Sequence, residues 1–142
     1  MTQKKRVLIL CTGNSARSQM AEGLLREFGG DKFAVESAGV APSSVRREAI
    51  EVMREISVDI SKHRSKSIGE FYGYNFDYII TVCDNAKETC PVFPGNATRI
   101  HRSFTDPPPE TVGDYQSRLK VFREVRDELR EWLRGFIQNQ KA

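Results

Sequence analysis

The sequence is poor in cysteine and histidine and contains no long hydrophobic run. Three cysteines cannot close into a full set of disulfides, which favours a reducing compartment such as the cytoplasm. Two histidines, and six residues between Cys83 and Cys90, do not give the ligand spacing of a zinc site. No stretch approaches the about 20 apolar residues of a membrane span, and no signal peptide is visible. We expect a cytoplasmic protein without membrane anchor, metal or cofactor.

Charge of either sign is not strongly in excess. The 142 residues carry a formal net charge of +3, with 39% apolar and 29% charged residues. This composition is ordinary for globular proteins, and the length suits one domain over residues 1–142. The mild positive charge suits a small anionic ligand but is too weak to indicate nucleic acid.

The order of strand and helix patterns predicts an α/β domain. Four short apolar runs have the composition of buried parallel strands: 5–10, 33–38, 76–82 and 98–101. Helical patterns cover four other segments: 17–28, about 42–56, 68–71 and 113–137. Strand–helix–strand units with short returns give right-handed crossovers and parallel pairing. We therefore predict a four-stranded parallel sheet with helices on both faces and a ligand site at the carboxyl ends of its strands.

The first apolar run leads into a turn that has the parts of an oxyanion site. Cys11 opens the turn, and the expected oxyanion-binding residues follow it: Thr12, Gly13, Asn14, Ser15, Ala16, Arg17 and Ser18. Backbone N–H groups at a helix N-terminus attract an anion and favour a cysteine thiolate. Arg17 adds a permanently charged fork. A nucleophile, N–H donors and a charge clamp are what displacement at a tetrahedral oxyanion requires.

Several residues of this turn have two interpretations. Cys11 is either the nucleophile or a buried cysteine that ends a strand, but Arg17 and the small polar residues have no place in a core. Asn14 shapes the loop either by adopting a positive φ or by bonding loop backbone. Ser18 either donates a hydrogen bond to the Cys11 thiolate or satisfies only backbone groups.

The segment Cys11–Ser18, continued by Met20-Ala21-Glu22, resembles the phosphate-binding loop of the low-molecular-weight protein tyrosine phosphatases. The segment Thr81–Pro91, which holds Cys83 and Cys90, resembles the two-cysteine segment of arsenate reductases that share this fold and are recycled by thioredoxin. The resemblance runs from about residue 5 to the C-terminal helix. It implies arsenate as substrate, phosphate or sulfate as analogues, thioredoxin as reductant, a role in arsenic resistance and weak phosphatase activity.

The resemblance also implies a three-cysteine relay. Cys11 attacks arsenate, Cys83 then attacks Cys11 as arsenite leaves, and Cys90 attacks Cys83 to free Cys11. Cys83 ends a predicted strand, at the sheet edge where Cys11 is expected. The relay requires movement of the segment 84–95, which we interpret as a loop. The alternative is that Cys83 is a buried strand-end residue and Cys90 an exposed thiol.

Asp106 precedes Pro107 and matches the Asp-Pro pair that supplies the general acid in the phosphatase family; the alternative is an ordinary turn aspartate. The prolines at 107–109 replace the tyrosines that many true phosphatases have there, and Ala16 stands where some reductases have another cysteine. We interpret His63 and His101 as structural or surface residues.

Some relatives hold a potassium ion near the phosphate loop, and Asn14, Glu22 and Ser37 match part of that site. Lys66 stands where some of them have an acidic ligand, so we expect no potassium site here.

Three functions compete with arsenate reduction through thioredoxin. One is a low-molecular-weight protein tyrosine phosphatase, which needs only one cysteine. Another is a redox sensor or anion-binding module without turnover. The last is the same reduction recycled by a different thiol carrier, although a second resolving cysteine favours thioredoxin.

Overall fold

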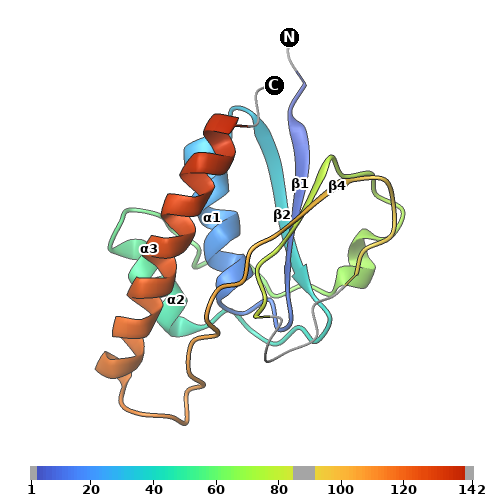
Figure 1. Cartoon of the computed structure of the whole chain (residues 1–142). Helices are drawn as coiled ribbons and strands as arrows, with labels where there is room; N and C mark the ends of the chain where they lie inside the picture. The colour runs from blue at the N-terminus through green and yellow to red at the C-terminus, as the bar shows by residue number, and fades with distance from the viewer. Residues whose placement is uncertain (1–2, 85–91, 140–142) are drawn as a thin grey trace.

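A parallel sheet forms the centre of the molecule (Figure 1). The computed structural model describes residues 3–84 and 92–139. The sheet contains β1 (Lys5–Cys11), β2 (Phe33–Gly39), β3 (Tyr78–Thr81) and β4 (Thr98–His101) in the order β2-β1-β3-β4. The helices are α1 (Arg17–Gly29), α2 (Arg47–Arg54), α3 (Tyr115–Asn139) and the 3-10 helix η1 (Ile68–Phe71). All three strand pairings are parallel, which confirms the predicted fold class.

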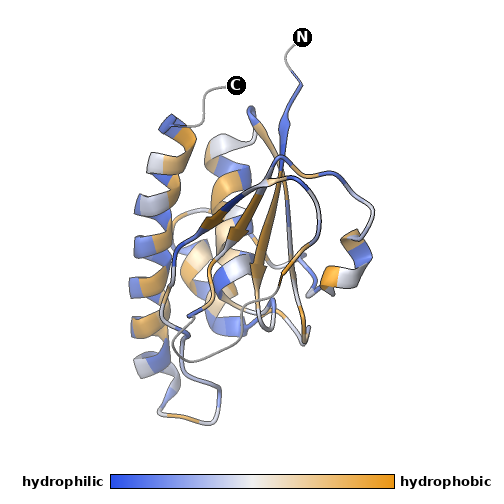
Figure 2. Ribbon diagram, turned by 45° about the vertical axis from the view of Figure 1, so that its right-hand side comes forward, coloured by the Kyte–Doolittle hydropathy of each residue, from blue (hydrophilic) through white to orange (hydrophobic). Residues whose placement is uncertain are grey.

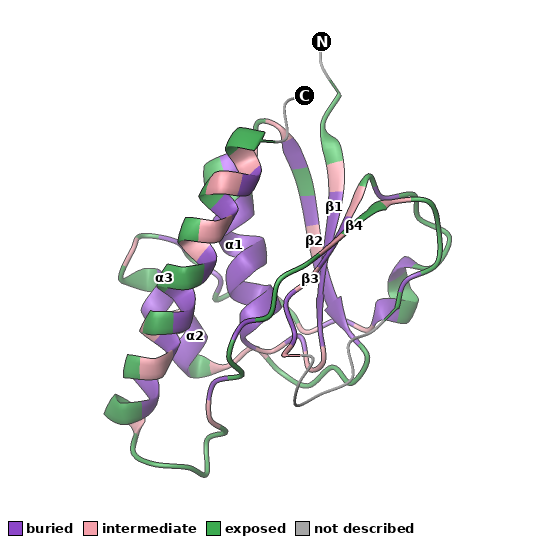
Figure 3. Cartoon of the chain, in the orientation of Figure 1, coloured by how far each residue is buried: buried purple, intermediate pink, exposed green. Residues whose placement is uncertain are grey.

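The central strand β1 is buried on both faces. Val7 and Ile9 belong to one hydrophobic cluster, and Leu8 and Leu10 belong to another. Figure 3 shows β1 in purple, for buried residues, everywhere except at its exposed N-terminal end. A continuous apolar run is the pattern expected of such a strand, because alternate side chains point into different layers.

The three α-helices pack in one layer against one face of the sheet (Figures 1 and 2). The helical pattern predicted over 113–137 corresponds to α3, which supplies six buried core residues: Leu119, Phe122, Val125, Leu129, Leu133 and Phe136. The spacing of three and four residues places these side chains on one side of the helix. Two charged residues of the same helix, Arg118 and Arg126, are also buried, which the apolar pattern does not predict.

The other face of the sheet is covered by η1 and the segments beside it. Leu8, Leu10 and Ala38 pack there against Ile68 and Phe71 of η1 and against an aromatic group that includes Phe76 and Phe93. The two faces are therefore covered unequally: the α-helices lie on one side and, within residues 3–84 and 92–139, the 3-10 helix η1 lies on the other.

Helix α2 begins at Arg47, several residues after the predicted start at 42–44. Two backbone N–H groups of the preceding segment donate to the turn that follows β1. Ala41 donates to the Thr12 carbonyl at 3.0 Å, and Arg46 donates to the Ser15 carbonyl at 2.9 Å. These bonds hold residues 41–46 in an extended path beside the turn, so the helix starts only after them.

No helix within residues 3–84 and 92–139 combines the length and the apolar character needed to cross a membrane.

Gly39 is expected to tolerate no side chain. A Cβ atom there would lie 2.5 Å from the Thr12 carbonyl oxygen and 2.9 Å from the Asn14 nitrogen, both in the turn backbone. Gly39→Ala should lower the free energy of unfolding by about 1–3 kcal/mol or more, as overpacking does. Urea unfolding followed by circular dichroism measures this change.

Gly135 in α3 is the matched control, because a Cβ atom there meets nothing within 4 Å. Gly135→Ala should raise the unfolding free energy by about 0.5–1 kcal/mol through helix propensity. Equal midpoints for Gly39→Ala and the wild type would contradict the predicted clash.

Candidate active site

The two chemically important strand ends lie side by side. Cys11 is the last residue of β1, and Cys83 follows the end of the neighbouring strand β3. The connection from β1 leads to β2 on one side, while β3 lies on the other, so the strand order reverses at this point. Open parallel sheets bind ligands in the crevice that such a reversal leaves at the carboxyl ends of the strands.

Cys11 is buried, with 2% of its surface exposed, and it is a free thiol. Its Sγ lies 2.9 Å from Ser18 Oγ. Ser18 Oγ already accepts an N–H from Asn14 at 2.8 Å, which leaves the serine proton free to point at the sulfur. This arrangement favours the interpretation in which Ser18 donates a hydrogen bond to a Cys11 thiolate.

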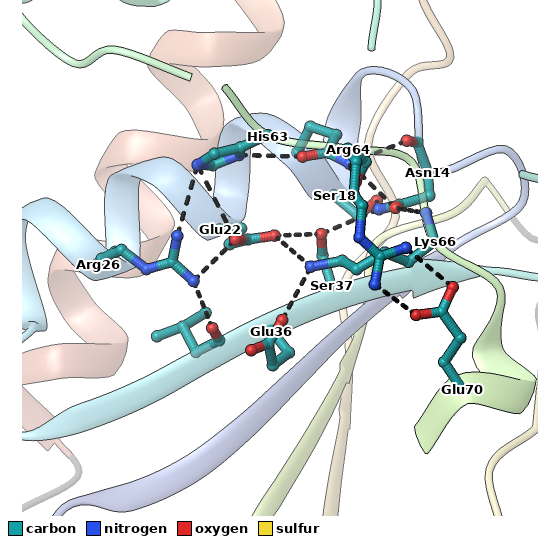
Figure 4. Close-up of polar contacts among 12 residues, drawn as sticks. Asn14, Ser18, Glu22, Arg26, Glu36, Ser37, His63, Arg64, Lys66 and Glu70 are labelled. Atoms are coloured by element: carbon teal, nitrogen blue, oxygen red, sulfur yellow. Dashed lines mark hydrogen bonds and ion pairs between the residues drawn. The ribbon is translucent and has the colours of Figure 1, made fainter. Parts of the chain in front are cut away.

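Asn14 holds the turn together from within (Figure 4). Its backbone has a φ of 48°, and its side chain is fully buried. The amide nitrogen donates to Ser18 Oγ at 2.8 Å and to Ser37 Oγ at 2.9 Å, and Oδ1 accepts from the Lys66 backbone at 2.7 Å and from Gln19 at 2.9 Å. Asn14 therefore adopts the positive φ of the first interpretation, while the backbone group that its side chain bonds is that of Lys66, outside the turn.

Behind Asn14, the network ends on the buried carboxylate of Glu22. Ser37 donates to Glu22 Oε1 at 2.5 Å. Two cationic groups balance this carboxylate: Arg26 at 2.8 Å and Lys66 at 3.5 Å. Figure 4 shows these side chains converging on Glu22. Because a buried carboxylate without partners is costly, the cations are part of the framework that supports the turn.

These residues do not fit a potassium ion. The Lys66 ammonium lies between Glu22 and Glu36, 2.8 Å from Glu36 Oε1, and already supplies a positive charge to the Glu22 carboxylate. A metal ion beside that ammonium would face like-charge repulsion. Among the described residues, no group of three or more histidine, cysteine or acidic side chains is arranged to hold a metal.

His63 is a half-buried structural residue. Burial lowers its pKa below the usual value; the Glu22 charge opposes this effect, while Arg26 and Lys66 reinforce it. Its Nδ1 lies 3.0 Å from Gln19 Oε1, so the neutral ring donates to Gln19. His101 is exposed, with Nδ1 2.6 Å from Thr81 Oγ1 and Nε2 3.0 Å from Ser103 Oγ.

Arg17 brings the turn and Asp106 together. The guanidinium is buried and donates to the Phe104 carbonyl at 3.3 Å. Its other terminal nitrogen lies 3.3 Å from Asp106 Oδ1, and the Asp106 side chain is 60% exposed. The structure thus places the predicted acid at the guanidinium that would hold an oxyanion, although the two residues are distant in sequence.

Cys90 lies outside the described residues, while Cys83 is buried and disulfide-bonded. Sequence reasoning missed Gln19, whose buried amide donates to the Arg64 carbonyl at 2.9 Å and to Asn14. Gln19 shares the side of α1 that carries Glu22 and Arg26, opposite the apolar side chains, so the helical pattern gives no signal that it is buried.

Removing the Lys66 charge should destabilise the fold. Lys66→Met leaves the buried Glu22 with fewer cationic partners, and losing a charged hydrogen bond of this kind costs about 1.5–3 kcal/mol. Arg64→Met is the control, because Arg64 pairs with Glu70 at the exposed surface and should cost less than about 1 kcal/mol. Urea unfolding at neutral pH compares the two variants, and an equal loss in both would contradict a special role for Lys66.

Comparison with known proteins places these features in a family. The model of the low molecular weight phosphotyrosine protein phosphatases matches residues 6–142. An arsenate reductase of Halalkalibacterium halodurans is 39% identical over 138 residues, covering 97% of this chain and 99% of the relative.

Solved structures agree with this placement. The structure of an arsenate reductase in the phosphate binding state has a TM-score of 0.77 at 31% identity, covering 96% of this chain and 99% of that one. A thioredoxin-dependent arsenate reductase of Corynebacterium glutamicum has a TM-score of 0.68 at 25% identity, covering 98% of this chain and 65% of that one. The chain described here therefore belongs to the low molecular weight phosphotyrosine protein phosphatase family.

Proposed function

We propose that this protein reduces arsenate to arsenite in the cytoplasm and that thioredoxin regenerates it. The observation that carries the proposal is the free thiol of Cys11, hydrogen-bonded to Ser18 at the mouth of a turn whose Arg17 faces an aspartate. Relatives similar over nearly their whole length are arsenate reductases, and a structural neighbour is thioredoxin-dependent.

The first step is displacement at arsenic. The Cys11 thiolate forms a sulfur–arsenic bond with bound arsenate, and one arsenic–oxygen bond breaks. Asp106 supplies a proton so that the departing oxygen leaves as water. Arg17 and the turn N–H groups hold the remaining oxygens while the charge redistributes. Ser18 stabilises the thiolate before the attack.

The second step transfers two electrons to arsenic. Cys83 attacks the Cys11 sulfur as a thiolate, and a Cys11–Cys83 disulfide forms. The electron pair of the sulfur–arsenic bond stays with arsenic, so As(V) becomes As(III) and leaves as arsenite. Cys90 then attacks Cys83 and displaces the Cys11 thiolate. Thioredoxin reduces the Cys83–Cys90 disulfide, which returns the enzyme to its starting state.

The thiol states of Cys11 and Cys83 support this order. Cys11 is a free thiol while Cys83 is disulfide-bonded, which is how the relay leaves these two residues after its second exchange. A disulfide between Cys11 and Cys83 would instead correspond to the preceding intermediate.

Phosphatase activity is the second candidate, because the matching family model is that of phosphatases. Cys11, Arg17 and Asp106 would suffice for phosphatase activity. Water would attack the phosphorus atom of a phosphate bound to Cys11, and the attack of Cys83 on the Cys11 sulfur would not be needed. We expect it as a weak side activity, since phosphate and arsenate are both tetrahedral oxyanions and would occupy one site.

The test is arsenate-dependent NADPH consumption with thioredoxin and thioredoxin reductase. The wild type should turn over repeatedly, and Cys11→Ser should be inactive. Cys83→Ser should release no arsenite, because the adduct has no internal thiol to resolve it. Cys90→Ser should release one arsenite per chain and then stop at the Cys11–Cys83 disulfide. Mass spectrometry of the trapped thiols identifies each stopping point.

The competing functions give different results in the same assay. A phosphatase would cleave an aryl phosphate with Cys11 alone and would not consume NADPH with arsenate. A redox sensor would form the Cys83 disulfide reversibly without consuming arsenate. Turnover with glutathione and glutaredoxin, but not with thioredoxin, would identify a different carrier.

A further inference from the structure

A buried ion cluster joins α2 and α3 away from the chemistry described above. Glu48 of α2 is fully buried. Its Oε2 accepts from Arg46 Nη2 at 2.9 Å and from Arg118 Nε of α3 at 2.7 Å. The Arg46 guanidinium also lies over the ring of Phe122, 5.0 Å from its centroid. The mechanism proposed above uses none of these groups.

Both arginines reach beyond Glu48 to the segment that carries Asp106. We call residues 102–114 the Asp106 loop. Arg46 Nη2 donates to the Pro108 carbonyl at 3.1 Å, and Arg46 Nε lies 3.5 Å from Glu110 Oε1. Arg118 Nη1 donates to the carbonyl of Gly113 at 2.7 Å and to that of Val112 at 3.3 Å. The cluster therefore bonds the Asp106 loop at two places that follow Asp106 in the sequence: residues 108–110 and residues 112–113.

Arg46 also contacts the anion-binding turn. Its backbone N–H donates to the Ser15 carbonyl at 2.9 Å. One residue thus bonds the turn through its backbone and the Asp106 loop through its side chain. Its bonds link the turn that holds Cys11 and Arg17 to the loop that carries the acid.

The Asp106 loop needs such external support. Three consecutive prolines, at 107–109, have no backbone N–H to donate, and the described loop contains no strand or helix. The side chain of Asp106 is 60% exposed, although Phe104 and Pro107 on either side of it are buried. Packing therefore anchors the backbone beside Asp106, while the polar contacts of Arg46 and Arg118 hold the part of the loop that follows.

We propose that Arg46, held by Glu48, is a positioning residue that fixes the Asp106 loop against the anion-binding turn and so aims the acid at the departing oxygen. This inference rests on the role of Asp106 in the proposed function. The same contact would serve oxyanion reduction and phosphate-ester hydrolysis, because both release an oxygen from one site.

The cluster stays ionised over the working pH range. Burial alone would raise the pKa of Glu48, but hydrogen bonds from Arg46 and Arg118 outweigh it and lower the pKa from 4.5 to about 2. Because the pKa of Glu48 is lower in the folded protein than in the unfolded chain, its ionised carboxylate stabilises the fold at pH values above 4.5. This stabilisation is lost as the pH falls from 4.5 toward 2. At neutral pH Glu48 is therefore ionised and pairs with both Arg46 and Arg118.

The first experiment compares Arg46→Lys, Asp106→Asn and the double variant on aryl phosphates with good and poor leaving groups. Lysine keeps the charge beside Glu48 but lacks the planar fork that also reaches Pro108. Arg46→Lys should lower kcat about tenfold for the poor leaving group, much less for the good one, and leave KM within about twofold. Arg54→Lys, an exposed arginine of α2, is the control and should behave as the wild type.

The double-mutant comparison decides whether Arg46 acts through Asp106. Adding Arg46→Lys to Asp106→Asn should cause no further loss of kcat, because the acid is already absent. An undiminished further loss would overturn the proposal, and so would an Arg46→Lys effect equal for both leaving groups.

A second experiment measures the loop without any turnover. Hydrogen–deuterium exchange of the amides in residues 102–114 should be faster in Arg46→Lys and in Glu48→Gln than in the wild type, and unchanged in Arg54→Lys. Unchanged exchange in Arg46→Lys would overturn the proposal. Failure of the wild type to reduce arsenate would instead count against the proposed function. The exchange and leaving-group results would still decide whether Arg46 positions the Asp106 loop.

Discussion

In the proposed mechanism the structure depends on one requirement: the turn after β1 has to present its backbone N–H groups to an anion. A turn that reserves these donors for a ligand cannot use them to hold its own shape. Asn14 supplies the missing bonds from its side chain, with both amide protons and the amide oxygen engaged while its backbone adopts a positive φ. The partners of this amide come from the start of α1, from β2 and from the segment around Lys66, so three separate parts of the chain shape the turn.

That requirement explains the charges buried behind the turn. Ser37 accepts from Asn14 and donates to Glu22, whose buried carboxylate would be costly without cations. Lys66 meets two needs at once: its backbone N–H bonds Asn14 Oδ1, and its ammonium lies near Glu22. A side-chain ammonium provides this charge permanently, whereas a bound metal ion would provide it only when present.

The four parallel strands, the helical segments and the Cys11–Ser18 turn could be predicted because they follow from local periodicity and a contiguous motif. The late start of α2 could not, since its cause is bonding of Ala41 and Arg46 to a distant turn. Nor could the pairing of Glu48 with Arg118, which are 70 residues apart. The helical pattern of α3 marks Arg118 as a polar position but not as a buried one. Gln19 was missed for the same reason.

In the proposed mechanism, reductase and phosphatase share the first displacement and differ in what attacks next. Hydrolysis requires water at the arsenic or phosphorus atom, whereas reduction requires a second sulfur at Cys11. Cys83 is fully buried and follows the strand beside β1, so the fold keeps this sulfur at the sheet edge where Cys11 reacts. Sulfur attack on sulfur becomes reduction only if the atom released can accept an electron pair. Arsenic(V) accepts it readily and phosphorus(V) does not, so one site can reduce arsenate and still leave phosphate unreduced.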